Sequence, residues 1–263
     1  MVRCFDDPNV IHVDGSVNPV RDKEVIDVEL ELKDLDSVEK KIQRLERVVK
    51  SGDKDAVKGI EVLKIYKAHL ESGKPARSAP LNANDKEYIA DIFLLTAKPV
   101  MYVCNVDEKS VISGNKYVEA LKALVKDEHA ELLVIAAAIE AEIAMLDSYE
   151  ERKVFLDDLG LAESGVTKLI KAAYRLLNLS TYFTAGEKEV RAWTIEQGMT
   201  APQAAGVIHT DFEKGFIKAE VISYQDFIAY GSESACRDAG KLAIEGKEYV
   251  VHDGDVMHFR FNV

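Results

Sequence analysis

The spacing of apolar residues predicts a helical hairpin in the first third of the chain. Five of them recur at intervals of 3, 4, 3 and 4 residues, the heptad seam of a helix packed on another helix: Leu35, Val38, Ile42, Leu45 and Val49. A break follows at Gly52, and residues 56–70 repeat the spacing with one polar interruption. We therefore expect helix over about residues 24–70, folded back at the break, with Asp34 or Asp36 as its N-cap. Two ordinary amphipathic helices on a core are the alternative, because neither seam reaches ~3 heptads.

Helical and buried-strand patterns alternate through the middle of the chain. Residues 99–104 and 132–137 are continuous apolar runs of strand length, typical of parallel strands covered on both faces. A short strand is also expected at residues 2–5. Helical patterns accompany the strands at residues 85–95, 117–125, 138–145, 150–159 and 166–177. This alternation predicts α/β construction around a parallel sheet.

The pattern changes again after residue 178. Strand-like runs occupy residues 181–184, 190–195, 217–222, 249–251 and 256–261, with short helices between them at 201–205 and 224–230. Strands and a crossing helix within so short a stretch predict a small α+β domain with a mixed, grasp-like sheet. The chain as a whole is therefore expected to be multidomain, α/β followed by α+β.

Composition and charge narrow the class of protein. The 263 residues include 34 Lys and Arg against 46 Asp and Glu, a net charge of -12, which argues against broad binding of a phosphate backbone but allows a local basic patch. No run approaches ~18 apolar residues, and no secretory signal is visible, so we expect a cytoplasmic protein without a membrane segment. Cys4, Cys104 and Cys236 are isolated from one another, which indicates reduced thiols rather than zinc ligands. The first two lie in strand-like runs and are expected to be buried.

The segment Asn105-Val106-Asp107-Glu108 follows a predicted buried strand, where open α/β sheets bind ligands. P-loop GTPases place Asn-Lys-x-Asp at this point, and the Asp accepts two hydrogen bonds from guanine. Here Glu108 replaces that Asp and Val106 replaces the Lys, so the bidentate geometry to guanine is lost and guanine selectivity should fall. The alternative is that Asn105 or Asp107 simply caps a helix.

The next predicted strand ends in three small residues, Ala136 to Ala138, which would let backbone N–H groups approach a base. A tight strand-to-helix packing point is the alternative. No Gly-x-x-x-x-Gly-Lys-Ser/Thr occurs in the sequence, so the phosphate cradle, its Lys and the Mg²⁺-binding hydroxyl are missing from it.

Several stretches together carry a resemblance to a known family. Residues 191–195, 198–206, 208–217 and 253–263 closely resemble the C-terminal TGS domain of the YchF/Obg-like ATPases. Upstream, residues 3–5, 11–13 and 105–108 match the pattern of that family in the same order, so the resemblance extends over essentially the whole chain.

The resemblance implies a domain plan and an activity. A partial GTPase-like nucleotide domain would comprise residues 1–22 and 73–177, a helical coiled-coil arm residues 23–72, and a ubiquitin-like β-grasp TGS domain residues 178–263. The complete protein would use ATP, GTP more weakly, with Mg²⁺, and would associate with the ribosome or ribosomal RNA. The P-loop and both switches would precede Met1, so we expect this chain alone to bind no nucleotide tightly and to hydrolyse none.

Carried over by position, the resemblance also implies site residues. The base would contact the following: Asn105, the Val106 backbone, Glu108, Ala136, Ala137 and Ala138. No metal ligand or catalytic residue is expected within the chain.

Four residues of the last domain are candidate contacts to RNA or to a partner: Arg191, His209, Lys214 and Lys218. Arg191, Lys214 and Lys218 could form one basic spot, although residues 178–263 hold only 8 Lys and Arg against 13 Asp and Glu. A solvated face for the charges, and a helix start for His209, are the alternatives. Trp193 is expected in the core, and His12 and His252 in turns or at the surface.

Two other functions stay open at this stage. The chain could be a non-enzymatic module that binds ribosome, RNA or protein through its helical arm and TGS domain. It could also be a non-ribosomal regulator that binds a protein partner through the heptad seam.

Overall fold

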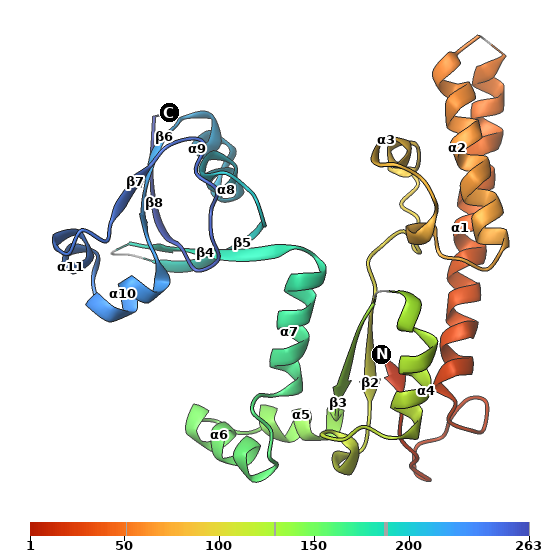
Figure 1. Cartoon of the computed structure of the whole chain (residues 1–263), viewed down its shortest axis with the longest axis horizontal. Helices are drawn as coiled ribbons and strands as arrows, with labels where there is room; N and C mark the ends of the chain where they lie inside the picture. Colours follow the sequence, from red (N-terminus) through yellow and green to blue (C-terminus); the bar gives the residue numbers. More distant parts are fainter. Residues whose placement is uncertain (51, 129, 187–188, 263) are drawn as a thin grey trace. The chain divides into compact units, whose positions relative to one another are not determined.

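The computed structural model describes residues 1–50, 52–128, 130–186 and 189–262 and divides into two compact units, Met1–Ile170 and Lys171–Val263 (Figure 1). Each unit has its own sheet and its own hydrophobic core.

The first unit contains a three-stranded parallel sheet in the order β1-β2-β3. Its strands are β1 (Val2–Arg3), β2 (Met101–Asn105) and β3 (Glu131–Ile135). Helices α4 (Lys116–Leu124), α5 (Ala137–Ala144), α6 (Tyr149–Asp158) and α7 (Gly165–Leu176) follow β2 and β3 in the chain. Cys4 and Cys104 are fully buried between sheet and helices, as expected. The predicted parallel sheet is confirmed.

Two long helices, α1 (Pro19–Val49) and α2 (Lys54–Glu71), pack side by side in this unit (Figure 1). The predicted start near residue 24 is wrong, because Asn18 is the N-cap and accepts a hydrogen bond from the Arg21 N–H (3.2 Å), with Pro19 in the first turn. Val38 of the seam is fully buried, and residues 76–97 share its core, so the hairpin packs on more than its own two helices.

Asp34 does not cap a helix. Its side chain links α1 to two later segments, and we call this set of hydrogen bonds the clamp. Asp34 lies in the middle of α1 and is only 1% exposed. Its carboxylate accepts hydrogen bonds from the Leu95 N–H (2.7 Å), the Thr96 N–H (2.7 Å) and the Thr96 hydroxyl (2.6 Å). The Thr96 hydroxyl oxygen in turn accepts from the Ala76 N–H (2.9 Å), at the start of the 3₁₀ turn η1 (Ala76–Ser78). The clamp therefore ties α1 to two segments more than 40 residues further along the chain.

The helix predicted at residues 85–95 is mostly absent. The structure has only α3 (Ala83–Lys86) and the 3₁₀ turn η2 (Glu87–Ile89) there, followed by turns in which Phe93 takes a φ of 47°. The N–H groups that a continued helix would have bonded internally at Leu95 and Thr96 are taken by Asp34 instead.

The second unit contains a mixed five-stranded sheet in the order β5-β4-β8-β6-β7. Its strands are β4 (Leu179–Ala185), β5 (Val190–Glu196), β6 (Phe216–Ile222), β7 (Ala243–Glu245) and β8 (Val256–Phe261), and only the β4–β8 pair is parallel. Helix α8 (Ala201–Ile208) packs its alanines on the core residues of one face, and α9 (Thr210–Lys214) follows it. Helices α10 (Tyr224–Tyr230) and α11 (Glu233–Asp238) follow β6.

One predicted strand of this unit is wrong. Residues 249–251 make only an isolated bridge, Thr200 to Val250, and β7 was not predicted. Two backbone hydrogen bonds form this bridge, from the Ala201 N–H to the Tyr249 carbonyl (2.8 Å) and from the Val251 N–H to the Met199 carbonyl (3.0 Å). The buried Asp255 also fixes the segment, since its carboxylate accepts from the Tyr249 hydroxyl (2.7 Å) and the His252 N–H (2.9 Å).

Candidate nucleotide-base site

The carboxyl ends of β2 and β3 lie next to each other and bring the predicted base-site residues together. Asn105 pairs in register with Ile135, and the Asn105 side-chain oxygen accepts a hydrogen bond from the Ala137 N–H (3.0 Å). Ala136, the N-cap of α5, has no side chain able to cap, so Asn105 caps that helix from the neighbouring strand. The alternative prediction, that Asn105 caps a helix, is therefore confirmed. The helix that it caps follows the neighbouring strand rather than its own.

Val106 and Ala136 form the buried floor of this edge, at 3% and 1% exposed. The Val106 N–H donates to the Ile135 carbonyl (2.8 Å), so this donor already has a partner within the protein. Ala137 and Ala138, in contrast, are exposed at the first turn of α5.

Glu108 is exposed and opens the 3₁₀ turn η3 (Glu108–Ser110). The cap of that turn is Asp107, whose carboxylate accepts a hydrogen bond from the Ser110 N–H (3.0 Å). This agrees with the alternative prediction that Asp107 caps a helix. Because Asp107 caps the turn, the Glu108 carboxylate is not needed as a cap and can contact a ligand at this edge.

Glu140 is a residue of this edge that sequence reasoning missed. Its carboxylate accepts hydrogen bonds from the Gly165 N–H (2.6 Å) and the Val166 N–H (3.1 Å), the first N–H groups of α7. A Cβ at Gly165 would lie 2.8 Å from both Glu140 and the Ile135 side chain, so only glycine fits. The one sequence signal was a glycine directly before an amphipathic helix.

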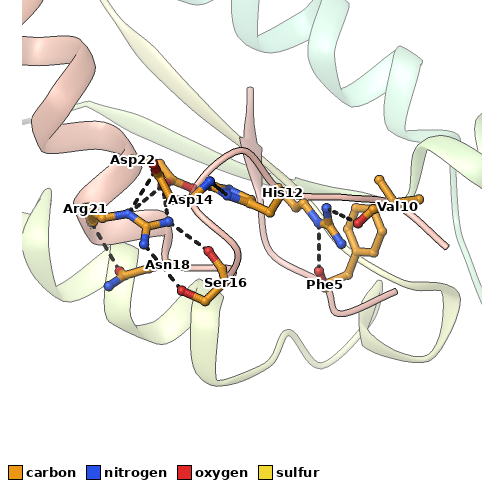
Figure 2. Close-up of polar contacts among 9 residues, drawn as sticks. Phe5, Val10, His12, Asp14, Ser16, Asn18, Arg21 and Asp22 are labelled. Carbon is orange, nitrogen blue, oxygen red and sulfur yellow. Dashed lines mark hydrogen bonds and ion pairs between the residues drawn. The ribbon is translucent and has the colours of Figure 1, made fainter. Parts of the chain in front are cut away.

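The loop after β1 leaves the sheet at the same edge and is held by two arginines. The Arg3 guanidinium donates to the carbonyls of Phe5, Asp7 and Val10 (3.1, 3.3 and 2.9 Å). Figure 2 shows the second arrangement, in which Arg21 bonds the Ser16 carbonyl (2.8 Å). Two large apolar side chains of this loop, Ile11 and Val13, are almost completely exposed.

His12, Asp14 and Asp22 also meet in this loop, with ligand-type atoms within 4.8 Å of one another. The Arg21 guanidinium lies 3.4 Å from Asp14 and 2.9 Å from Asp22, and His12 bonds Asp22 at 3.0 Å (Figure 2). The guanidinium already neutralises these carboxylates, so the group is an ion-pair network that closes the loop.

The four candidate RNA contacts do not form one spot. Arg191 lies on the edge strand β5, stacked 4.0 Å over the ring of the half-buried Trp193. His209 caps α9 by accepting from the Asp211 N–H (3.2 Å), and Lys214 ends that helix. Lys218 lies on β6, separated from β5 by two strands. The expectation of a single basic spot is wrong, because sheet order rather than sequence distance decides which charges meet.

A large cavity of the first unit lies elsewhere, at the amino-terminal ends of β1 and β2. It measures about 1040 Å³, and its polar wall includes Lys23, Arg77, Tyr102 and Glu128. The Glu128 carboxylate accepts from Lys23 (2.7 Å), the Tyr102 hydroxyl (2.7 Å) and Arg77 (3.3 Å). Burial raises the pKa of Glu128, but the bonds from Lys23 and Tyr102 outweigh it and hold that pKa below its ordinary 4.5.

We expect the stability of the first unit to fall in acid partly through Glu128. Because its folded-state pKa lies below the unfolded value, its contribution is complete above pH 4.5 and is lost as the pH falls through the folded pKa. Glu128→Gln should lower the free energy of unfolding at neutral pH by about 1–3 kcal/mol. It should also flatten the acid limb, the part of the stability curve in which the free energy of unfolding falls with falling pH. Urea titrations followed by circular dichroism across this pH range measure both. An acid limb as steep as that of the unaltered chain would contradict the assignment.

The fold defines a mixed α/β protein with a three-stranded parallel sheet and a second unit built on a mixed sheet. None of the helices within the described ranges is long and apolar enough to cross a membrane. A family model described as "YchF-GTPase_C: Protein of unknown function (DUF933)" matches residues 179–262. The whole chain is 51% identical to the ribosome-binding ATPase YchF of Bacillus subtilis, covering 72% of that protein, and 43% identical to Obg-like ATPase 1 of Gallus gallus, covering 67%.

A solved structure agrees with these relatives. The Schizosaccharomyces pombe YchF GTPase superposes with a TM-score of 0.85 at 38% identity, over 98% of this chain and 70% of that one. The chain therefore belongs to the YchF/Obg-like ribosome-binding ATPase family.

Proposed function

We propose that this chain is the larger part of an ATPase that associates with the ribosome, and that the edge formed by Asn105, Val106, Glu108 and Ala136 to Ala138 receives the nucleotide base. The observation that carries the proposal is the hydrogen bond from the Ala137 N–H to Asn105, which fixes two strand ends into one rigid edge. The names of the relatives, ribosome-binding ATPase and Obg-like ATPase, supply the activity.

The residues of this edge favour adenine over guanine. The Val106 N–H is engaged by Ile135, which leaves its carbonyl oxygen as the group that can accept from the amino group of adenine. At the position where related GTPases use Asp, the longer Glu108 cannot keep two parallel bonds to guanine. A preference for ATP over GTP in the complete protein follows from these two features.

We further propose that this chain alone does not hydrolyse ATP. Phosphoryl transfer depends on positioned cations and backbone N–H groups around the phosphates, and the sequence contains no P-loop. Mg²⁺ belongs to the activity of the complete protein, but the described residues do not fit it, since His12, Asp14 and Asp22 are already bridged by Arg21. No step is therefore assigned to a metal in this chain.

Release of phosphate from ATP by the purified chain tests this proposal. We expect none above the buffer background. Turnover that disappears in the Asn105→Ala variant would overturn it. In the complete protein, Glu108→Asp is the base-specificity control, because it should shift the preference toward GTP.

The second candidate is a non-enzymatic ribosome-binding module. It is favoured by the hairpin of α1 and α2, which we interpret as a coiled-coil arm (residues 23–72), and by the second unit, which we interpret as a β-grasp TGS domain (residues 178–263). The nucleotide domain would comprise residues 1–22 and 73–177. Both candidates place the protein in the cytosol. Co-sedimentation with ribosomes that does not change with added ATP would favour the module, and absence of co-sedimentation would count against both.

A further inference from the structure

Glu31 of α1 is a buried carboxylate without a bonding partner. The residue is only 8% exposed, and among the residues that the structure describes no cation or hydrogen-bond donor lies at bonding distance from its carboxylate. Burial, together with the neighbouring Asp27, raises the pKa of Glu31, and Lys23 and Arg77 offset only part of this rise. A buried carboxylate without a partner is unfavourable, so the position favours a partner from outside the chain.

The Glu31 side chain lines the cavity at the amino-terminal ends of β1 and β2, which measures about 1040 Å³. Lys23, Asp27 and Glu31 follow one another at intervals of four residues on α1, so they share one face of the helix, and all three line the cavity. Residues of the segments 73–78 and 95–102 also line it. A ligand in the cavity can therefore reach the Glu31 carboxylate directly.

The cations nearest to Glu31 are already bound to other carboxylates. Lys23 lies 2.5 Å from Asp27 and 2.7 Å from Glu128, and Arg77 lies 3.3 Å from Glu128. The charged side chains of this cluster are two cations and three carboxylates: Lys23, Arg77, Asp27, Glu31 and Glu128. One negative charge is therefore left without a counter-charge, and it lies on Glu31.

The exposed charges of the lining do not change this balance. They are two cations and two carboxylates, which cancel: Lys74, Lys98, Glu24 and Asp127. A hydrated lysine at the surface also loses side-chain entropy and solvation when it is fixed on a buried carboxylate. A single positive charge brought by a ligand would complete the cluster.

The uncharged part of the lining indicates what should carry that charge. It includes several apolar side chains: Val28, Leu30, Pro99, Val100 and Met101. An aliphatic chain would be buried against them. A planar guanidinium gives two parallel hydrogen bonds to one carboxylate and is more weakly hydrated than an ammonium, so it loses less on entering the cavity.

We propose that this cavity binds a guanidinium group carried on a short aliphatic chain, with Glu31 as its carboxylate partner and the apolar lining around the chain. A free alkylguanidine and an arginine side chain of a peptide share this chemistry. The guanidinium site is independent of the proposed base site, because the two lie at opposite ends of β2.

Nuclear magnetic resonance titration of the full chain with butylguanidinium tests the site. We expect saturable shifts, and N-butylurea, which has the same shape without the charge, should bind at least about tenfold more weakly. Glu31→Gln should weaken binding of butylguanidinium by about tenfold. The control Glu29→Gln removes an exposed carboxylate of the same helix outside the cavity and should change the affinity less than about twofold. Equal affinity for the two probes, or an affinity unchanged in Glu31→Gln, would overturn the proposal.

Two further arms separate binding from folding and identify the source of the group. Because Glu31→Gln removes an unpaired buried charge, its thermal midpoint by circular dichroism should be no lower than that of the unaltered chain. A lower midpoint would mean that Glu31 already has a partner in the chain and would contradict the site. N-acetylarginine amide that binds as tightly as butylguanidinium would support a peptide arginine as the source, and several-fold weaker binding would support a free alkylguanidine. Binding of neither would overturn the proposal.

Discussion

Replacing Asp34 by alanine should destabilise the first unit by about 3–5 kcal/mol. The substitution removes a buried carboxylate that accepts three hydrogen bonds and leaves the Leu95 and Thr96 donors without a partner inside the protein. Residues 94–97 should then detach from α1, which exposes the seam around Val38.

Urea unfolding of the full chain measures this loss, with far-ultraviolet circular dichroism as the readout of the helices. Asp34→Asn keeps the shape and one good acceptor, so its loss should fall between those of the unaltered chain and the alanine variant. Asp36→Ala is the matched control on the same helix, since the side chain of Asp36 is about half exposed and pairs with the neighbouring Lys40. An Asp34→Ala midpoint equal to that of Asp36→Ala would show that the clamp contributes nothing.

Replacing Tyr182 by alanine should destabilise the second unit by about 3–5 kcal/mol. Tyr182 is fully buried on β4, meets the ring of Phe259 edge-on at 5.8 Å, and donates its hydroxyl to the Ala204 carbonyl (2.9 Å). The alanine variant leaves a cavity between the sheet and α8 and removes the hydrogen bond to the Ala204 carbonyl. Tyr182→Phe removes only the hydrogen bond and should cost about 1 kcal/mol.

The single tryptophan, Trp193, makes this experiment specific, because it lies on β5 beside Tyr182 in the sheet register. Its fluorescence should follow the Tyr182 variants closely and the Asp34 variants much less. Tyr230→Ala, at a partly exposed tyrosine of the same unit, is the control and should leave the midpoint within about 1 °C. Equal shifts in Tyr182→Ala and Tyr230→Ala would refute the assignment of Tyr182 to the core.

Much of the fold could be predicted from local pattern. The apolar runs at residues 99–104 and 132–137 became β2 and β3, and the helix expected at residues 224–230 is α10. Local pattern failed at two segments that are bonded to a buried carboxylate. Asp34 took the N–H groups of a predicted helix, and Asp255 fixed residues 249–251 that looked like a strand.

The candidate sites divide in the same way. Asn105 and Ala137 were predicted to share an edge because both follow buried strands, and parallel strands end together. The capping bond between them needed the register of β2 against β3. Arg191, Lys214 and Lys218 are close in sequence but belong to different elements, and the residue opposite Lys218, Arg260, depends on the pairing of β6 with β8.

The sequence by itself determined most of the secondary-structure pattern, the parallel sheet, the two buried thiols of that sheet and the family, since periodicity and motif spacing depend on neighbouring residues. Only the tertiary structure decided that Asp34 bonds Leu95 and Thr96, that Asn105 of β2 caps α5, the helix after β3, and that Lys218 faces Arg260. The physical reason is that these contacts join residues 32 to 62 positions apart, or depend on strand order. Hydrogen-bond partners and charge neighbours at such separations are set by which surfaces meet on folding, and local sequence carries no record of that choice.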